Sequence, residues 1–523
     1  MPTQRTASSL LRRLASLGAA LVTVGAAGTA TAAPDTTRVI VAFKPGAAAA
    51  GRQAVAAARG SVKVELDWAN AMAIEVPSRA LAGLARNPNI AYVEEDAKRY
   101  PLALTTPSTG TPYATGQLVP YGIQMVQADQ VSDAAAGNRK VCIIDSGYDN
   151  AHEDLAGNPV AGLYDSGTGN WFTDENHHGT HVAGTIAAIN NAGTGVVGVN
   201  PNKKLLLHIV KVFGADGWAY SSSLASAANQ CRTYGANVIS MSLGGSVKVR
   251  AEETTFAQIY SAGILPIAAA GNDGNKRVSY PAGYASVMSV AALDENKAWA
   301  TFSQYNSDVE IAAPGVAVLS TVPMGTGSSS ALTVGGTAYA PGDMEGSPKL
   351  SRSGTLADFG LGGSATAGSM TGRVCLIQRG TYDFATKVAN CQASGGVGAV
   401  VYNNVAGSFG GTLGTTVTTI PSVTASDTEG TALRAQFGQS ATVSVTASNY
   451  AYFDGTSMAT PHVSAVAALV WSLHTNCTAA QIRSTLAKSA EDLGTAGRDT
   501  RFGHGLVRAK AAHDRISTLG CAN

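Results

Sequence analysis

The strongest constraint on the fold is an alternation of two sequence patterns between about residues 117 and 325. Short apolar runs of strand length follow one another, and alanine-rich stretches of helical length lie between them. The runs are Val141–Ile144, Leu205–Val212, Asn237–Met241 and Ile264–Ala270, and the stretches are His178–Ile189, Leu224–Tyr234 and Glu252–Ala262. Such alternation is typical of a parallel sheet with helices on both faces. We therefore expect an α/β domain.

A change of composition interrupts this α/β pattern. From residue 326 to about residue 448 the chain is rich in glycine, serine and threonine and has a strand-like pattern. Helical periodicity resumes at Ser457–Leu473. The simplest account is a β-rich domain, residues 326–448, inserted into a loop of an α/β domain that comprises residues 117–325 and 449–523.

The chain ahead of residue 117 has a pattern of its own. Residues 34–103 contain strand-like runs at Val39–Phe43 and Ala71–Val76, and Arg79–Arg86 suits a short helix. An order of strand, helix, strand, strand, helix, strand is typical of a small ferredoxin-like α+β unit. Residues 104–116, rich in threonine, proline, serine and glycine, are predicted to form an exposed linker that is open to cleavage.

The first 33 residues have the pattern of an export signal. Arginines between positions 5 and 13 precede the charge-free stretch Leu14–Thr29, and Ala30-Thr31-Ala32 is a small-x-small cleavage site. A membrane anchor is the alternative, but alanine and glycine dominate this run and it is barely long enough to span a bilayer. No later apolar run is long enough, so we expect a secreted, soluble mature protein.

The balance of charge excludes two classes of protein. Lys+Arg 36 against Asp+Glu 35 gives a net charge of +1, and no clustered basic face for a nucleic acid is visible. With 45% hydrophobic and 14% charged residues, the chain is also unlike a disordered protein.

The six cysteines form an even set, which in an exported chain indicates disulfides. Cys375 and Cys391 lie in one segment, and Cys477 and Cys521 both lie near the C-terminus, which leaves Cys142 for Cys231. Six cysteines allow 15 connectivities, so this pairing is a preference only. None of them has the sequence context of a cysteine-protease nucleophile.

The first motif with chemical content is a carboxylate at the end of a buried strand. Asp145 follows the run Val141–Ile144 and precedes Ser146-Gly147. Sites in parallel α/β sheets form at the carboxyl ends of the strands, which favours a functional role for Asp145. Capping of a turn is the alternative that these residues alone leave open.

The second motif, His177-His178-Gly179-Thr180-His181, opens an alanine-rich helix. An imidazole at a helix N-terminus lies near the positive end of the helix dipole, which favours the neutral form that acts as a base. His177 and His181 are four residues apart and could hold a metal ion, but the glutamate that a metalloprotease requires between them is absent. We assign these two histidines to capping and packing and expect no catalytic metal.

The third motif is Gly455–His462, which precedes the helical stretch Val463–Leu473. Pro461 fits a helix only near its first turn, so Ser457 lies at a helix start beside free backbone N–H groups. A lone serine at such a place is more often an N-cap. Its occurrence together with the other two motifs favours a nucleophile.

Together these motifs resemble the subtilisin family of serine proteases. The matching segments are Asp145–Gly147, His178–Gly184 and Gly455–His462, in the family's order of Asp, His and Ser. The resemblance covers about residues 117–325 and 449–515. It implies the subtilisin-like parallel sheet and hydrolysis of peptide bonds by acyl-enzyme chemistry.

The resemblance assigns a role to each matching residue. Ser457 would attack the scissile carbonyl, His178 would take its proton and later return it, and Asp145 would hold the imidazole. Asn272, in the segment Ala268–Asn272, would donate its side-chain amide to the developing oxyanion together with the Ser457 backbone N–H.

The substrate-binding residues are also inferred from the resemblance. The segment Ser242, Leu243, Gly244 and Gly245 resembles the strand that pairs with an extended peptide. Ser279 aligns with the floor of the S1 pocket, where no acidic residue aligns. We therefore predict broad cleavage that favours large apolar P1 residues and not basic ones.

A structural calcium ion is a further implication. The side chains of Gln117, Asp154 and Asn191 and the carbonyl groups of Ile189, Thr194 and Val196 match the family's tight calcium site. Carboxylate, amide and carbonyl oxygens suit Ca²⁺. A solvated loop is the alternative.

The two flanking units match known modules. Residues 34–103 resemble the inhibitory propeptide of these enzymes, especially at Ala91–Asp96, and self-processing is expected between Tyr100 and Gln117. The insert resembles a protease-associated domain at Gly372–Gly380 and Gly396–Asn404, which is expected to shape substrate access or bind partners. Arg379 and Asp383 within it are assigned to structural pairing.

The sequence thus predicts a secreted serine endopeptidase, made as a self-processing zymogen, whose partners are protein or peptide substrates and its own propeptide. It predicts no nucleic-acid partner and no membrane anchor in the mature form. An adhesive or binding protein that has lost activity is a second class, against which the intact triad and Asn272 argue. A metallohydrolase built on His177 and His181 is a third. A serine-directed covalent inhibitor separates the three.

Overall fold

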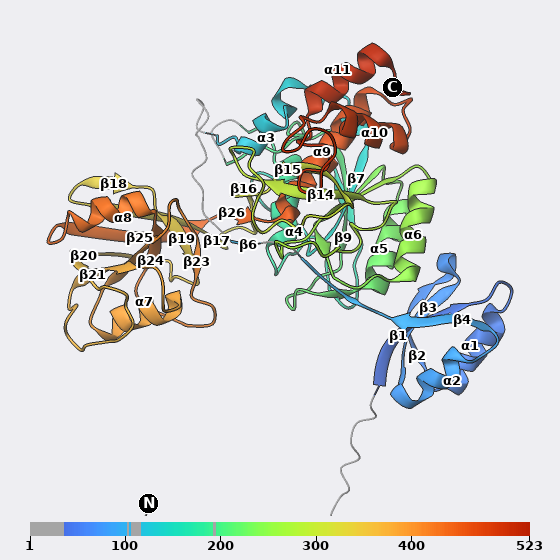
Figure 1. Ribbon diagram of the computed structural model, residues 1–523, viewed down its shortest axis with the longest axis horizontal. Helices are drawn as coiled ribbons and strands as arrows, with labels where there is room; N and C mark the ends of the chain where they lie inside the picture. Colours follow the sequence, from blue (N-terminus) through green and yellow to red (C-terminus); the bar gives the residue numbers. More distant parts are fainter. Residues whose placement is uncertain (1–35, 102–103, 106–116, 192–194, 523) are drawn as a thin grey trace, which may run out of the picture.

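The computed structural model describes residues 36–101, 104–105, 117–191 and 195–522. The predicted signal peptide, residues 106–116 of the predicted linker and the expected calcium ligand Thr194 lie outside these ranges. Figure 1 shows three folded units: a blue N-terminal unit, a central unit coloured from cyan to green and red, and an orange unit.

The central unit is built on a sheet of seven strands that are all parallel. Their order is β15-β14-β13-β11-β7-β9-β8. The strands are β7 (Lys140–Asp145), β8 (Val160–Gly162), β9 (Leu206–Lys211), β11 (Val238–Met241), β13 (Leu265–Ala269), β14 (Met288–Leu293) and β15 (Val309–Pro314). The prediction of a parallel α/β sheet is confirmed.

Helices cover both faces of this sheet because the side chains that its strands direct to each face are apolar. Val141 and Ile143 of β7 face one core together with helices α4 and α9, whereas Cys142 and Ile144 face a second core with α5 and α6. The helices of this unit are α3 (Tyr121–Met125), α4 (His178–Ala187), α5 (Ser221–Thr233), α6 (Arg250–Ser261), α9 (Thr456–Leu473), α10 (Ala479–Ser489) and α11 (Ala509–Leu519), with short 3₁₀ turns η3 (Ala128–Gln130) and η4 (Ala136–Asn138).

Helix α9 lies at the centre of the first core. Nearly all of its residues are buried, which agrees with a sequence that is apolar on every side. Pro461 falls within its first turns and is accommodated there. Among the helices in the described ranges, none has the length and apolar composition that crossing a membrane requires.

The N-terminal unit is a four-stranded antiparallel sheet with two helices. Its sheet order is β2-β3-β1-β4, which is the ferredoxin-like arrangement expected from the sequence. Its elements are β1 (Thr36–Phe43), α1 (Ala48–Ala57), β2 (Ser61–Leu66), η1 (Asp67–Ala69), β3 (Ala71–Pro77), η2 (Ser78–Ala80), α2 (Leu81–Ala85) and β4 (Ile90–Glu95). A further strand, β5 (Lys98–Pro101), leaves the unit and pairs with β10 (Ala219–Tyr220) and β12 (Leu243–Gly244) of the central unit.

The insert forms a separate unit with a nine-stranded mixed sheet. Its order is β18-β17-β25-β20-β21-β22-β24-β19-β23. The strands are β17 (Gly327–Val334), β18 (Thr337–Tyr339), β19 (Gly342–Glu345), β20 (Ser351–Asp358), β21 (Arg373–Gln378), β22 (Gly398–Tyr402), β23 (Gly411–Thr412), β24 (Ser422–Ala425) and β25 (Ser440–Ser448). The unit also contains helices α7 (Phe384–Ala393) and α8 (Asp427–Arg434), so it is less purely β than its composition indicated.

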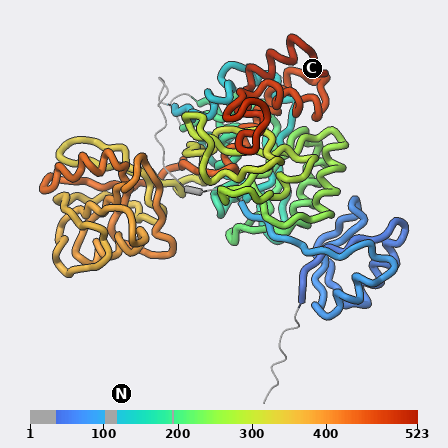
Figure 2. The backbone as a smooth tube through the Cα atoms, in the orientation of Figure 1, coloured from blue at the N-terminus to red at the C-terminus, as the bar shows by residue number. Residues whose placement is uncertain are grey.

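Two antiparallel strands connect the insert to the central unit. These are β16 (Val318–Thr321) and β26 (Tyr450–Asp454), and β26 also pairs with β6 (Leu104–Thr105). Figure 2 shows the chain entering and leaving the orange unit through this narrow connection. The insert therefore begins and ends at neighbouring points of the central unit.

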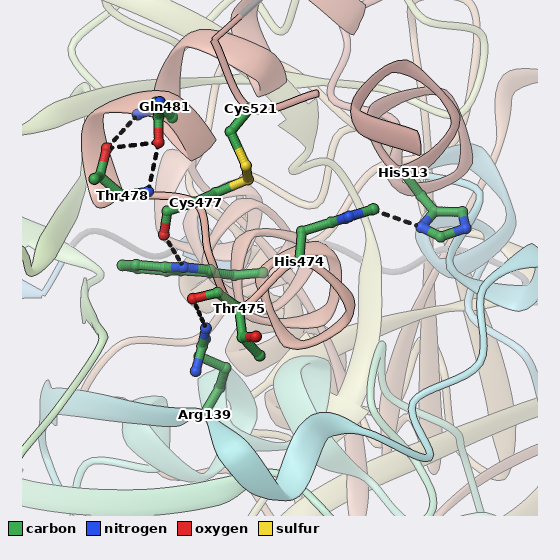
Figure 3. The surroundings of a disulfide bond; sticks show 9 residues. Arg139, His474, Thr475, Cys477, Thr478, Gln481, His513 and Cys521 are labelled. Atoms are coloured by element: carbon green, nitrogen blue, oxygen red, sulfur yellow. Dashed lines mark hydrogen bonds between the residues drawn. A yellow bond between two sulfur atoms is a disulfide. The ribbon is translucent and has the colours of Figure 1, made fainter. Parts of the chain in front are cut away.

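Three disulfides link elements within the units. Cys142 of β7 is joined to Cys231 of α5, and Cys375 of β21 is joined to Cys391 of α7. Cys477 is joined to Cys521, which ties the segment after α9 to the end of α11 (Figure 3). This is the connectivity that the cysteine positions favoured.

Candidate active site

Asp145 and His178 form a buried hydrogen-bonded pair. Asp145 is the last residue of β7, and His178 is the first residue of α4. The imidazole Nδ1 donates to the carboxylate Oδ1 over 2.7 Å. The other ring nitrogen, Nε2, is buried and has no hydrogen-bond partner within the described ranges. The carboxylate thus orients the ring so that Nε2 is available to a second group.

The start of α4 is held in place by a buried aspartate that the sequence analysis did not single out. Asp174 accepts hydrogen bonds from the backbone N–H groups of His177 and Thr180, over 2.9 and 2.8 Å, and from the Ser146 hydroxyl over 2.8 Å. Gly179 lets the helix approach the strand end, because a Cβ there would lie 2.3 Å from the carbonyl oxygen of Gly147. Asp174 is recognisable only as an acidic residue shortly before a helix.

Ser457 lies in the first turn of α9 and exchanges two hydrogen bonds with Ser242. The Ser457 hydroxyl donates to the carbonyl of Ser242 over 2.8 Å, and the Ser242 hydroxyl donates to the carbonyl of Ser457 over 2.7 Å. Ser242 directly follows β11, the strand beside β7. Ser457 is therefore fixed against the strand that neighbours the Asp145 strand.

Asn272 is oriented by the residue that precedes Ser457. Its side-chain oxygen accepts hydrogen bonds from the backbone N–H and the hydroxyl of Thr456, over 2.9 and 2.8 Å. A backbone N–H can only donate, so the amide oxygen must face Thr456 and the NH₂ group must face away from it. This leaves the NH₂ as a fixed donor near the start of α9.

The sheet topology explains why these residues gather. Asp145, Ser242 and Asn272 end or closely follow β7, β11 and β13, which are adjacent and parallel. Their carboxyl ends meet at one edge of the sheet, where helix α9 also begins. An arrangement of carboxylate, imidazole, hydroxyl and fixed N–H donors can carry out acyl transfer.

The two other histidines of the second motif have structural roles. The His181 ring is fully buried and stacks on Phe453, and its Nε2 lies 2.9 Å from the carbonyl of Val318. Burial lowers the pKa of His181 to about 3, so the ring is neutral. His177 is the N-cap residue of α4 but makes no capping bond with its side chain, since Asp174 does so instead. Within the described residues, no group of three or more His, Cys, Asp and Glu side chains could hold a metal ion.

Strand β5 pairs with Leu243 and Gly244 of the segment Ser242–Gly245, and Lys98 and Tyr100 of β5 line a cleft beside this pairing. Tyr100 pairs with Gly244 and Pro101 with Leu243 in antiparallel register, while Arg99 pairs with Ala219 on the other side. The cleft has a volume of about 1140 Å³, and its wall includes Gly244, Gly245 and Ser279. The chain's own residues thus lie where an extended peptide would pair with β12.

The N-terminal unit is anchored on the N-termini of α5 and α6. The Asp96 carboxylate accepts from the Ser222 backbone N–H over 2.9 Å and from its hydroxyl over 2.6 Å. The Glu94 carboxylate accepts from the backbone N–H groups of Arg250 and Ala251, each over 2.9 Å. Carboxylates at helix N-termini are stabilising because the N–H groups there lack partners and carry partial positive charge.

The expected calcium ligands converge in the described part of the loop. Gln117 Nε2 lies 3.1 Å from the carbonyl oxygen of Ile189, 3.0 Å from Asn191 Oδ1 and 3.1 Å from the carbonyl oxygen of Val196. An NH₂ group has two hydrogens, so it cannot satisfy three acceptors fully. Three oxygens around one point are the environment that a cation requires.

Asp154 supports the same conclusion. Its Oδ2 accepts from the Val196 N–H over 2.6 Å, whereas its buried Oδ1 has no hydrogen-bond partner among the described residues. Burial raises the pKa of this carboxyl group, which a bound cation would counteract. Gly195 has a φ of +60° and lies so close that a Cβ would meet Asp154 Oδ2 at 1.9 Å. These residues fit a calcium ion.

The insert reaches the vicinity of the Asp145–His178 pair. A cavity of about 520 Å³ is lined on one side by Asn176 and His178 and on the other by Asp343, Glu345 and Lys349 of the insert. Elsewhere in the insert, Arg379 and Asp383 do not pair with each other. Arg379 donates to Asn403 over 3.0 Å, and Asp383 caps helix α7 by accepting from the Thr386 N–H.

Comparisons with known proteins agree with this geometry. Residues 137–347 and 390–505 match the subtilase family, and residues 340–433 match the PA domain. Subtilisin E of Bacillus subtilis (strain 168) is 37% identical over 273 residues, which are 51% of this chain and 67% of that protein. Subtilisin DY of Bacillus licheniformis is 40% identical over 240 residues, which are 45% of this chain and 84% of that protein.

Two solved structures have a similar fold. A psychrophilic subtilisin-like protease from the Antarctic psychrotroph Pseudoalteromonas sp. AS-11 superposes with a TM-score of 0.62 at 44% identity, over 77% of this chain and 99% of that one. Fervidolysin from Fervidobacterium pennivorans, a keratinolytic enzyme related to subtilisin, gives a TM-score of 0.60 at 22% identity, over 92% of this chain and 61% of that one. The second likeness concerns the fold alone.

Proposed function

This chain belongs to the subtilase family and is a subtilisin-like serine endopeptidase, and we propose that it is secreted as a precursor whose N-terminal unit inhibits it until self-cleavage. The proposed limits are residues 1–33 for the signal peptide, 34–103 for the propeptide and 104–116 for the processing region. The peptidase domain comprises 117–325 and 449–523, and the protease-associated domain comprises 326–448. The export pattern and three disulfides support secretion.

In the proposed mechanism Ser457 is the nucleophile. Its hydroxyl turns from the Ser242 carbonyl toward His178 Nε2, which takes the proton as Oγ attacks the scissile carbonyl. Asp145 holds Nδ1–H, fixes the tautomer and stabilises the imidazolium, which then protonates the leaving amine. A water molecule attacks the acyl-enzyme by the same route.

The oxyanion is stabilised by the Asn272 NH₂ and the Ser457 N–H. Because Thr456 holds the Asn272 oxygen, the donor is oriented before the reaction and needs no reorganisation as charge develops. Loss of the equivalent donor in a subtilisin costs about 10²–10³ in kcat, a magnitude already known for this family.

One observation supports the proposed inhibition by the N-terminal unit. Strand β5 lies between β10 and β12, so a substrate cannot pair there until residues ahead of the cleavage site leave. Self-cleavage between Tyr100 and Gln117 releases the unit. The mature enzyme then cleaves proteins broadly and favours large apolar P1 residues, since Ser279 and not an acid lies at the predicted S1 floor.

Calcium is the proposed structural cofactor, and no metal is proposed for the reaction. Gln117, Asp154 and Asn191 would hold it with the carbonyl groups of Ile189, Thr194 and Val196. A bound ion would supply positive charge against the Asp154 carboxylate and would stabilise the folded state.

Mass spectrometry of the secreted protein tests the proposal. Wild type should lose its N-terminal unit and should react with a serine-directed covalent inhibitor. Ser457→Ala should keep the unit and should not react. Ser464→Ala, the same change at a buried hydroxyl farther along α9, should mature like wild type. Normal maturation of Ser457→Ala when it is expressed alone would refute self-processing.

A further inference from the structure

A buried ion pair joins the N-terminal unit to the wall of the substrate-binding cleft. Arg99 Nη2 lies 2.5 Å from Glu252 Oε2, and Arg99 Nε lies 3.1 Å from Oε1, so the contact is bidentate. Both side chains are 0% exposed. Glu252 belongs to the first turn of α6, whereas Arg99 belongs to β5, which the proposed processing removes.

The groups around this pair also form hydrogen bonds with the guanidinium group and its carboxylate. The Val247 carbonyl accepts from Arg99 Nη2 over 3.1 Å, and the Tyr284 hydroxyl donates to Glu252 Oε2 over 2.6 Å. Burial is the largest single influence and lowers the pKa of Arg99, but the charge and hydrogen bonding of Glu252 together with Tyr284 hold that pKa above its usual value. Gly245 leaves space for β5, because a Cβ at this position would lie 2.6 Å from the Lys98 carbonyl oxygen and 3.1 Å from Arg99 Nη1.

Release of the propeptide removes the charged partner of Glu252. Removing one partner of a buried ion pair is costly because it leaves an uncompensated buried charge. A substrate that places an arginine in the same position would restore the pair. A substrate with an apolar residue there would leave Glu252 with the Tyr284 hydroxyl but without a cation.

The register of β5 identifies the position of that arginine in a substrate. Ser242 lies beside the Ser457 hydroxyl, so the substrate residue opposite Ser242 is P1. The residues opposite Leu243 and Gly244 are then P2 and P3, which are the places of Pro101 and Tyr100. Arg99 precedes Tyr100 and therefore occupies the P4 position.

We propose that Glu252 is a specificity-determining residue that makes the mature enzyme select arginine at P4. The inference deepens the proposed function and rests on it, since Glu252 meets substrates only after the N-terminal unit has left. Selection at P4 adds to the apolar preference at P1 and is separate from it.

Cleavage of a matched peptide series tests this inference on the mature wild-type enzyme. The internally quenched peptides share one sequence with leucine at P1 and differ at P4, where they carry arginine, citrulline, lysine, leucine or alanine. Citrulline has nearly the shape of arginine without its charge. We expect kcat/KM for arginine to exceed that for citrulline by about 10- to 100-fold, the range for a hydrogen bond to a charged group.

Two variants assign the effect to Glu252. Glu252→Gln should reduce the ratio of arginine to citrulline to near one. Glu253→Gln, the same change at a neighbouring partly exposed residue of α6, should keep the wild-type ratio. If Glu252→Gln fails to mature because Arg99 is left unpaired, the double variant Arg99→Gln/Glu252→Gln removes both charges and yields the same mature enzyme.

The outcomes separate this inference from the proposed function. Equal cleavage of the arginine and citrulline peptides by wild type would overturn the role of Glu252 while the peptidase assignment stands. An arginine preference that persists in Glu252→Gln would also overturn it. Failure of the wild-type enzyme to cleave any peptide would instead contradict the proposed function.

Discussion

At the scale of single residues, Asp454 shows how burial sets the state of a carboxyl group. Asp454 ends β26, is 6% exposed and accepts a hydrogen bond from the Ala317 N–H over 2.5 Å. Burial raises its pKa to about 6, and that single hydrogen bond offsets the effect only in part. The folded protein therefore holds a proton that the unfolded chain releases between about pH 4 and pH 6.

Ionised Asp454 therefore destabilises the folded protein at neutral pH, and the variant Asp454→Asn should remove this destabilisation. Because the folded pKa lies above the unfolded value, the contribution of Asp454 to stability falls as the pH rises through this window and is constant above it. In the Ser457→Ala precursor, Asp454→Asn should raise the free energy of unfolding by up to about 3 kcal/mol near pH 7 and should change it little near pH 4. Thermal unfolding at both pH values measures this, with Asp129→Asn at an exposed site as the control. A shift of equal size at both pH values would contradict the assignment.

How much of this could be predicted from the sequence depends on how far apart the cooperating residues lie. The parallel sheet was predictable because strands such as β7 are contiguous apolar runs, and each chemical motif is itself contiguous. Strands β14 and β15 were missed because their runs are rich in alanine and, in β15, interrupted by Glu310. The Arg99–Glu252 pair could not be predicted, because the two residues are 153 positions apart in the sequence and only the pairing of β5 with the central unit brings them together.

At the scale of elements, helix starts depend on groups supplied from other parts of the chain. Helix α5 was predicted to begin at Leu224 but begins at Ser221. Serines favour caps over helix interiors, and α5 has no capping bond from its own N-cap side chain. Asp96 of the N-terminal unit instead satisfies the Ser222 N–H, which extends the helix. The prediction failed there because the cap belongs to a different unit.

The proposed calcium site allows a prediction at this scale. Chelation of calcium from the Ser457→Ala precursor should lower its melting temperature, and millimolar calcium but not magnesium should restore it. An ion at 100 times its dissociation constant contributes about 2.7 kcal/mol to the folded state. Asp154→Asn should abolish the response, because it removes the charge from the buried Oδ1 side of the site. Asp129→Asn should respond like the parent, and an unchanged melting temperature on chelation would exclude a structural ion here.

At the scale of the whole molecule, the insert is attached so that it can be removed without cutting the central sheet. Its two ends meet at β16 and β26, where Thr321 pairs with Tyr450. The Val322 N–H also donates to the Asn449 carbonyl over 2.9 Å. None of the seven parallel strands belongs to residues 326–448. The insert has cores of its own, around β20 to β25 and around α7.

Replacement of residues 326–448 by a short glycine-serine linker should therefore leave a folded, active peptidase. Of β5, which lies where short peptides would pair with β12, only Pro101 lines the cavity that the insert borders, so kcat/KM for short peptides should stay within about twofold of wild type. Large folded substrates should be cleaved several-fold faster, because the cavity beside His178 loses the wall that contains Asp343, Glu345 and Lys349. Parallel assays with a quenched peptide and a folded protein, on enzyme shown to be mature by mass spectrometry, measure the two effects. If deletion leaves the cleavage rate of each substrate unchanged, the insert does not restrict access. If deletion slows cleavage of the folded protein alone, the insert binds substrate instead.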